Sequence, residues 1–237
     1  MLTKKLDFVE IILNRFAPNT SFKNVVLVGA QHILPSTLHM LQSLLARGLQ
    51  TSNIHLIGKC YSSDPETYRS MVACGIKVCP SSILFNKDEC FDAVYSKNID
   101  AFIKRTISSS NLESNSEIII LDDGGHLISR LNGQQIIQDR ISCVEQTSAG
   151  YEKLKTLPLK FCVINVARSK PKLEIESQVV ASTAIKAFMN KLVLQNIRNR
   201  EVLVIGSGAI GSAIADALEG QFNVTTTDID PAKASYS

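Results

Sequence analysis

The chain has 237 residues, of which 45% are hydrophobic and 20% are charged, and its formal net charge at pH 7 is +3. This balance is typical of a soluble globular protein with a full hydrophobic core, and it excludes an intrinsically disordered chain. Such a small charge excess gives no electrostatic reason to expect a nucleic acid or an anionic membrane as a partner. The length allows one large domain or two smaller ones.

The N-terminal segment, residues 1–16, has the pattern of an amphipathic helix, and its acids at positions 7 and 10 distinguish it from a secretory signal peptide. No apolar run approaches the ~20 residues that cross a bilayer. The six cysteines form no CxxC pair, so we expect reduced thiols, buried where they stand in or beside apolar runs, at Cys74, Cys79, Cys143 and Cys162. These features predict a cytoplasmic protein with no metal site and no membrane partner.

Short β-rich runs alternate with helical patterns along the chain. The expected strands are residues 23–30, 52–58, 75–80, 116–123, 140–147, 159–166, 200–206 and 222–228. The helical stretches include residues 35–47, 65–73, 174–194 and 209–219. Most of the strand runs are apolar without alternation, as strands covered on both faces are. The pattern therefore predicts an α/β fold, with a parallel sheet between two layers of helices.

The clearest chemical signal is a glycine pattern near the C-terminus. Gly206, Gly208 and Gly211 follow a predicted strand and lead into a predicted helix, so backbone amides there can approach a pyrophosphate closely. Asp228 ends the next strand, roughly 20 residues later, where an acid binds the hydroxyls of an adenosine ribose. This unit predicts a bound dinucleotide, and the acid favours NAD over NADP. The alternative is a tight turn with close helix packing and no ligand.

The predicted dinucleotide unit is incomplete. A full dinucleotide-binding sheet has six strands in two halves, whereas Asp228 is followed by only nine residues. We therefore expect either a fragment of a longer protein or a natural truncation. The expected organisation is a parallel-sheet, Rossmann-like substrate domain over residues 1–180, a connecting helix and linker over 181–199, and the truncated start of a Rossmann NAD-binding domain over 200–237.

Further polar clusters follow predicted strands. Asp122 and Asp123 open the segment LDDGGHL, at the strand edge where open α/β folds bind ligands. The alternative is a turn in which one of these acids caps the next helix. The segment VEQTSAG also ends a strand in polar side chains. Lys170 and Glu174 are four residues apart, a spacing that suits either an exposed helix pair or a positioned acid–base couple.

The order and spacing of these clusters resemble the S-adenosylhomocysteine hydrolase family. The matching segments are QHILPST (31–37), GKCYSSDPE (58–66), LDDGGHL (121–127), VEQTSAG (144–150), INVARSKPKLEIES (164–177), VLVIGSGAIGSAIADAL (202–218) and TDIDP (227–231). The resemblance covers nearly the whole chain. It is specific in the order of the motifs and weaker in residue identity.

The resemblance implies an NAD-dependent hydrolase of one-carbon metabolism, a nucleoside-like substrate and a homo-oligomer. In that reaction the 3′-hydroxyl of the ribose is oxidised, a thiol is eliminated, water adds and the ketone is reduced again. The implied catalytic residues are His32 and Asp123 for proton transfer at C4′ and C5′, and Lys170 and Glu174 at the 3′-hydroxyl. The implied cofactor contacts are Thr147, Ser148, Gly206, Gly208, Gly211 and Asp228, and the implied substrate positions are Leu34, Ser36, Thr37 and Gln146.

Several positions depart from the family pattern. Leu34 and Ser36 stand where the family has a Thr and a Glu near the adenine, and Gln146 stands where it has a Glu that contacts the ribose. Glu174 replaces an Asp, and His126 replaces the Asp of the GGDL segment. We therefore expect an altered base pocket, or alternatively a non-catalytic relative that serves as a nucleotide-binding or oligomeric scaffold protein.

Two expectations follow for the chain as a whole. Asp123, Lys170 and Glu174 are expected to share one cleft beside the dinucleotide loop. The 237-residue chain is expected not to turn over alone, because contacts to the nicotinamide side of the cofactor lie beyond the segments that it contains.

Overall fold

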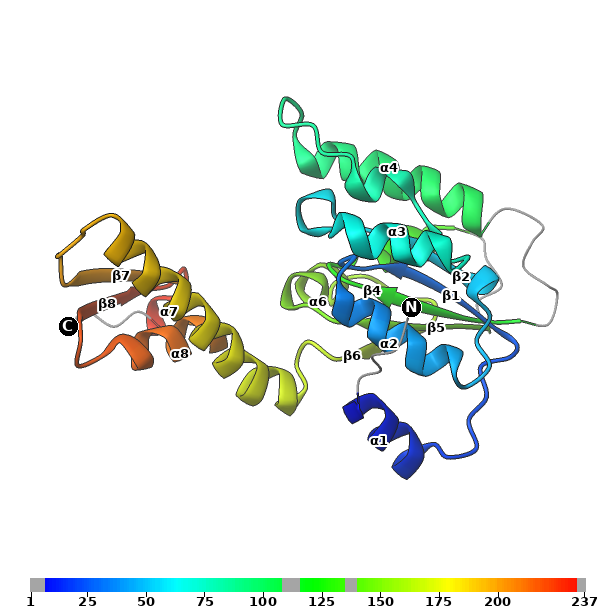
Figure 1. Ribbon diagram of the computed structural model, residues 1–237, viewed down its shortest axis with the longest axis horizontal. Helices are drawn as coiled ribbons and strands as arrows, with labels where there is room; N and C mark the ends of the chain where they lie inside the picture. Colours follow the sequence, from blue (N-terminus) through cyan, green and yellow to red (C-terminus); the bar gives the residue numbers. More distant parts are fainter. Residues whose placement is uncertain (1–6, 108–115, 135–139, 234–237) are drawn as a thin grey trace. The chain divides into compact units, whose positions relative to one another are not determined.

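A computed structural model describes residues 7–107, 116–134 and 140–233 (Figure 1). The chain divides into two compact units, Met1–Val166 and Ala167–Ser237. The division falls at the end of the last strand of the first unit. Residue 180, where the predicted substrate domain ends, lies inside a helix of the second unit.

The first unit is built on a parallel sheet. Its strands are β1 (Val25–Ala30), β2 (Ile54–Ile57), β3 (Lys77–Val78), β4 (Glu117–Asp122), β5 (Ile141–Glu145) and β6 (Cys162–Asn165). They lie in the order β3-β2-β1-β4-β5-β6, with every neighbouring pair parallel. This is the doubly wound order of a Rossmann-like fold, so the predicted α/β class is confirmed. The strand order reverses between β1 and β4, where such sheets open a crevice at their carboxyl ends.

The helices of this unit are α1 (Asp7–Phe16), α2 (Pro35–Leu45), α3 (Pro65–Ala73), α4 (Phe91–Thr106), α5 (His126–Asn132) and α6 (Ser148–Leu154). The predicted helices 35–47 and 65–73 are confirmed as α2 and α3. Both begin at a proline, whose fixed φ suits the first helical position. Asp64 precedes α3 and accepts a hydrogen bond from the Thr67 amide at 2.7 Å, which fixes where that helix starts.

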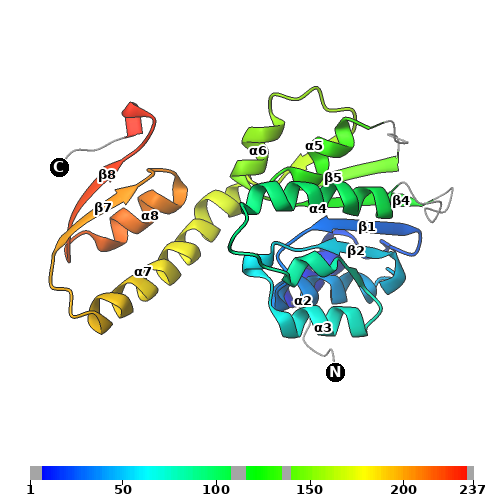
Figure 2. The same ribbon diagram turned by 90° about the horizontal axis from the view of Figure 1, so that it is seen from above.

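The core lies in two layers, one on each face of the sheet. Val25 and Leu27 of β1 pack with α2 and α3, while Val26 and Val28 pack with α4 and α5. Figure 2 shows α2 and α3 on the side of the sheet away from α5 and α6. Alternate side chains of one strand are therefore buried on opposite faces of the sheet. This explains why the strands are continuous apolar runs in the sequence.

The second unit consists of a π-helical segment Pro171–Glu176, helix α7 (Ser177–Leu194), strand β7 (Glu201–Ile205), helix α8 (Ala209–Leu218) and strand β8 (Asn223–Thr227). β7 and β8 are parallel and α8 connects them, which makes one βαβ unit. The predicted helix 174–194 begins later, at Ser177, because the preceding six residues form the wider π turn.

In the described part of the chain, no helix is long and apolar enough to cross a bilayer. Within the same ranges, no group of three or more His, Cys, Asp or Glu side chains could hold a metal ion. All six cysteines are free, and Cys79 and Cys143 are buried as expected. Cys74 is half-buried. The expectation that Cys162 is buried was wrong, because its strand, β6, forms an edge of the sheet.

Candidate functional site

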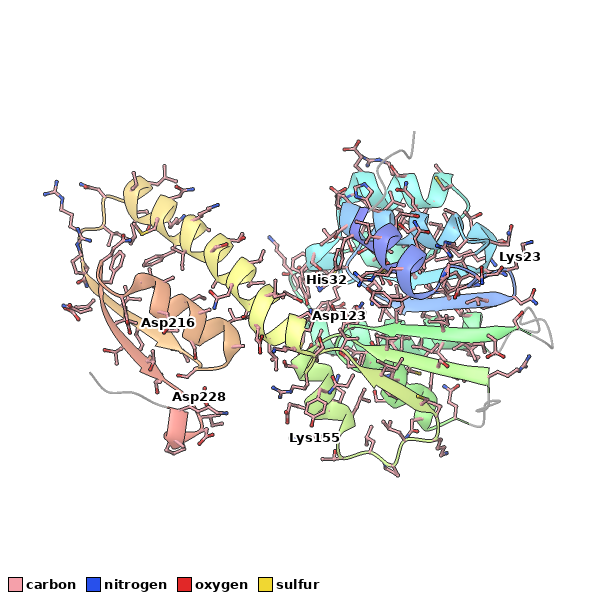
Figure 3. All side chains as sticks on the ribbon, turned by 90° about the horizontal axis from the view of Figure 1, so that it is seen from below. Lys23, His32, Asp123, Lys155, Asp216 and Asp228 are labelled. Atoms are coloured by element: carbon pink, nitrogen blue, oxygen red, sulfur yellow. The ribbon has the colours of Figure 1, made fainter. Side chains whose placement is uncertain are left out.

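Three loops meet at the carboxyl edge of the sheet in the first unit. His32 follows β1, Lys59 follows β2 and Asp123 follows β4. Because β1 lies between β2 and β4, these loops are neighbours although they are far apart in sequence. Figure 3 shows His32 and Asp123 close together. The site therefore stands where the strand order reverses.

Asp123 joins the other two side chains into one cluster. Its Oδ2 lies 3.5 Å from His32 Nε2, and its Oδ1 accepts a hydrogen bond from the ammonium of Lys59. The other ring nitrogen of His32, Nδ1, is hydrogen-bonded to the Ser62 hydroxyl. Lys59 is buried, and the Asp123 side chain is 15% exposed. We call these three residues the His32–Lys59–Asp123 cluster.

The environment of His32 keeps its imidazole neutral near pH 7. Burial lowers the pKa of His32 and is the largest influence; Asp123 raises the pKa, and Lys59 lowers it. In a neutral imidazole, one ring nitrogen carries a proton that it can donate, and the other has a lone pair that can accept a proton. Beside a carboxylate and an ammonium, it makes a group suited to proton transfer.

The two acids of the LDDGGHL segment have different surroundings. Asp122 is fully buried, and its Oδ2 accepts a hydrogen bond from the Ile128 amide in the first turn of α5 at 2.9 Å. Burial raises the pKa of Asp122 to about 7. Its Oδ1 and the nearby hydroxyl of Tyr95 have no hydrogen-bond partner among the described residues. Asp122 thus binds the helix, as the second alternative for this segment expected, and Asp123 lines a cavity, where its contact with a ligand stays a prediction.

A second carboxylate, Glu145 at the end of β5, ties two loops together. It is 1% exposed and accepts hydrogen bonds from the amides of Gly124 and Gly125 at 3.2 and 2.8 Å. It also accepts from the amide and the hydroxyl of Thr147, each at 2.7 Å. A Cβ at Gly150 would overlap this carboxylate, so only glycine fits there. The loops after β4 and β5 therefore share one buried anchor.

The positions assigned to the cofactor in this unit lie in the second of those loops. The Thr147 hydroxyl donates to Glu145 and accepts from the Gly150 amide at 3.0 Å, so it caps α6. Ser148 is exposed. Thr147 lines the adjoining cavity. Their contact with a cofactor stays a prediction.

The positions that the resemblance assigns to the substrate lie in the loop after β1, in the first turn of α2 and in the loop after β5. The side-chain Oε1 of Gln146 accepts a hydrogen bond from Nε2 of Gln31 at 2.8 Å. The Thr37 hydroxyl donates to the His32 carbonyl at 2.7 Å, and Leu34 and Ser36 are exposed. The Thr37 hydroxyl therefore holds the backbone of His32 in place. Contact of Leu34, Ser36, Thr37 and Gln146 with a substrate stays a prediction.

A cavity of about 520 Å³ opens beside the cluster. Its wall consists of Lys59, Asp92, Ser96, Asp123, Gly124, His126, Arg130, Thr147, Ala149 and Lys153. Most of these residues have polar or charged side chains. The cavity is large enough for a small metabolite.

Lys170 and Glu174 belong to the second unit. Their side chains are 78% and 62% exposed, and Lys170 Nζ lies 3.8 Å from Glu174 Oε2. The pair has the geometry of the exposed helix pair that the spacing allowed. The shared cleft with Asp123 stays a prediction.

The three glycines of the predicted dinucleotide loop differ in what the surrounding structure requires of them. Gly206 has φ +101°, in the left-handed region that favours glycine. A Cβ at Gly211 would overlap the carbonyl oxygen of Gly206, so α8 could not pack there with a larger residue. Gly208 has φ −73°, and a Cβ there would meet no atom within 4 Å. Nothing among the described residues requires glycine at this position.

Asp228 faces the glycine loop at the end of β8. Its Oδ2 accepts from the Ser207 amide at 2.6 Å, and its Oδ1 accepts from the Asp230 amide at 2.9 Å. These hydrogen bonds, first that of Asp230 and then that of Ser207, lower the pKa of Asp228. The carboxylate is therefore ionised near pH 7.

No family model matches the chain. Two uncharacterized proteins of Mycobacterium tuberculosis, from two different strains, are each 36% identical to it over 195 residues. The matched region is 82% of this chain and 38% of each mycobacterial protein, so the chain spans less than half the length of these relatives. Because both relatives are uncharacterized, the likeness assigns no activity.

Proposed function

We propose that the chain supplies the substrate site and the cofactor loop of an NAD-dependent hydrolase of the S-adenosylhomocysteine hydrolase type, acting on a nucleoside-like substrate. The observation that carries the proposal is the His32–Lys59–Asp123 cluster. The resemblance assigns His32 and Asp123 to proton transfer at two adjacent carbons, and these two side chains lie 3.5 Å apart at the crevice of the sheet. Such convergence of distant segments supports a common chemical task.

Each residue of the cluster has a different role in the proposed reaction. Replacing the thiol at C5′ by water requires a base that removes the proton from C4′ and an acid that protonates the departing sulfur. The Asp123 carboxylate can accept the proton, and the neutral His32 can deliver one. Lys59 orients Asp123 through their ion pair. The resemblance assigns the proton of the 3′-hydroxyl to Lys170 and Glu174.

The glycine loop fits the proposed cofactor. The open space at Gly208 lets the backbone approach a pyrophosphate. Such a ligand would explain the glycine at a position where no contact within the described residues requires one. Each Asp228 oxygen accepts one amide hydrogen bond and keeps a lone pair for a ribose hydroxyl. The same negative charge repels the 2′-phosphate of NADP. When bound, NAD would supply a reversible hydride acceptor.

Titration calorimetry with NAD and NADP tests the cofactor. We expect NAD to bind and NADP to bind at least about tenfold more weakly. Gly208→Ala should weaken NAD binding without changing the stability of the fold, whereas Gly211→Ala should destabilise the fold because its Cβ overlaps the Gly206 carbonyl. Unchanged NAD affinity in Gly208→Ala, or no NAD binding by the unaltered chain, would contradict the proposal.

Adenosine binding in the presence of NAD tests the substrate site. Binding is the readout, because it is measured without turnover. Adenosine should shift the NMR signals of the His32 ring, and Asp123→Asn should weaken its binding about tenfold. Glu117→Gln is the matched control, because Glu117 is an exposed acid at the opposite end of the same strand. Equal effects of the two substitutions, or no shift at His32, would rule out the site.

A further inference from the structure

The cavity beside Asp123 carries basic side chains from three segments. Lys59 follows β2, His126 and Arg130 belong to α5, and Lys153 belongs to α6. These residues come together only in the folded chain. Proton transfer by the cluster uses Lys59 alone among them, so the other three have no part in the proposed reaction.

Arg130 is held in a fixed position with one end of its guanidinium open. Its Nε donates to Asp100 Oδ1 at 2.6 Å, and its Nη2 donates to the Ser96 hydroxyl. The side chain is 27% exposed. Its Nη1 has no hydrogen-bond partner in the described ranges, so a donor on the wall of the cavity is oriented in advance for an acceptor.

Lys153 and His126 form a second set of donors. Lys153 Nζ donates to the Gly124 carbonyl at 2.7 Å and lies 3.4 Å from His126 Nδ1, and no carboxylate of the described part lies within ion-pair distance of it. Burial, followed by the charges of Lys153, Lys59 and Arg130, lowers the pKa of His126 to about 4. The imidazole is therefore neutral near pH 7. Because an ammonium faces Nδ1, the ring proton lies on Nε2, which makes His126 a further donor.

Asp100, which lies outside the wall, is ion-paired with Arg130 through Nε, and the two acids on the wall leave the remaining donors open. Asp123 is occupied by Lys59 and His32, and Asp92 is exposed, so water and salt screen its charge. An ammonium, a guanidinium nitrogen and an imidazole N–H remain for a ligand. A phosphoryl group offers three oxygens to such a set, whereas a planar carboxylate offers two. His126 also stands where the hydrolase family has an Asp, whose charge would repel a phosphoryl group.

We propose that this cavity binds the phosphoryl group of a small phosphorylated metabolite through Arg130, His126 and Lys153. That the metabolite is the substrate rests on the proposed function, since the cavity also contains Asp123. Binding itself is measured without turnover. Its failure is therefore distinguishable from failure of the hydrolase proposal.

Calorimetry with inorganic phosphate tests this inference on the 237-residue chain. We expect phosphate to bind, with sodium acetate at equal ionic strength binding more weakly. Lys153→Met should weaken phosphate binding about tenfold, which is the loss expected for one charge-assisted hydrogen bond. Lys155→Met is the matched control: Lys155, labelled in Figure 3, directly follows α6, and it is paired with the exposed Glu152. It is not among the residues that line the cavity.

NMR with labelled protein locates the bound phosphate. Shifts centred on Gly124, His126 and Lys153 would support the inference, and shifts confined to the loop 206–211 would overturn it. Equal weakening by the two lysine substitutions, or equal affinity for acetate and phosphate, would also overturn it. Lys153→Arg keeps the charge and should retain binding, which separates loss of the donor from loss of the fold. If adenosine and NAD bind while phosphate does not, only this inference fails.

Discussion

Asp122→Asn tests the buried carboxyl beneath the candidate site. Burial raises the pKa of Asp122 from 3.8 to about 7, so the folded state holds this proton more tightly than the unfolded state does. The stabilisation that results is fully present below pH 4 and is lost as the pH rises through 7. At about 1.4 kcal/mol per pKa unit, the loss amounts to about 4 kcal/mol. An asparagine cannot ionise, and its amide nitrogen can take the place of the unpartnered Oδ1.

The assay is urea denaturation of both proteins between pH 4 and pH 8. His32, His55 and His126 have lowered pKa values, so they stabilise the fold above pH 6.5 and lose that contribution as the pH falls. Their effect opposes that of Asp122 and hides it in the unaltered protein alone. The difference between the two proteins at each pH cancels the histidines, and it should shift by about 4 kcal/mol in favour of Asp122→Asn from the acid to the alkaline end.

A difference in unfolding free energy that stays constant across this range would refute the reasoning, because Asp122 would then not titrate there. A difference that moves in favour of the unaltered protein as the pH rises would also refute it. That result would mean that the folded chain stabilises the ionised carboxylate.

Two further substitutions test the contacts around the site. Gly150→Ala should destabilise the fold by roughly 2–4 kcal/mol in urea denaturation, because the added Cβ overlaps the buried Glu145 carboxylate that joins the two loops. Gly133→Ala is the control. An added Cβ there would lie 3.5 Å from its nearest neighbour, so stability should change by less than about 1 kcal/mol. Lys59→Met should raise the pKa of His32 in an NMR titration, because the ammonium of Lys59 lowers it. Lys77→Met is the control, since Lys77 acts on a different histidine and should leave His32 unchanged.

The alternation of strands and helices could be predicted because the strands of a doubly covered sheet are apolar on both faces. The ends of elements were harder to predict. The run 75–80 yields only Lys77–Val78 as a strand, because Pro80 begins a 3-10 turn. Helices α5 and α6 have seven residues each, which is too short for an apolar period to stand out.

The candidate site was predictable only where a motif marked it. His32 and Asp123 carry the family resemblance, and they are in contact. Lys59 and Glu145 were missed, because each acts on a partner in another loop. Their roles depend on the register of neighbouring strands, such as the pairing of Asp122 with Glu145 between β4 and β5, and no local sequence pattern records that register.

The Glu145 anchor has a consequence for how this molecule can acquire new specificity. Since one carboxylate binds the amides of both loops, the backbone at the base of the cavity keeps its shape when residues on the wall are exchanged. An insertion in either loop would instead release both at once. Evolution of a different ligand preference is thereby directed toward point replacements such as those at Ala149 and Lys153, with loop length held constant.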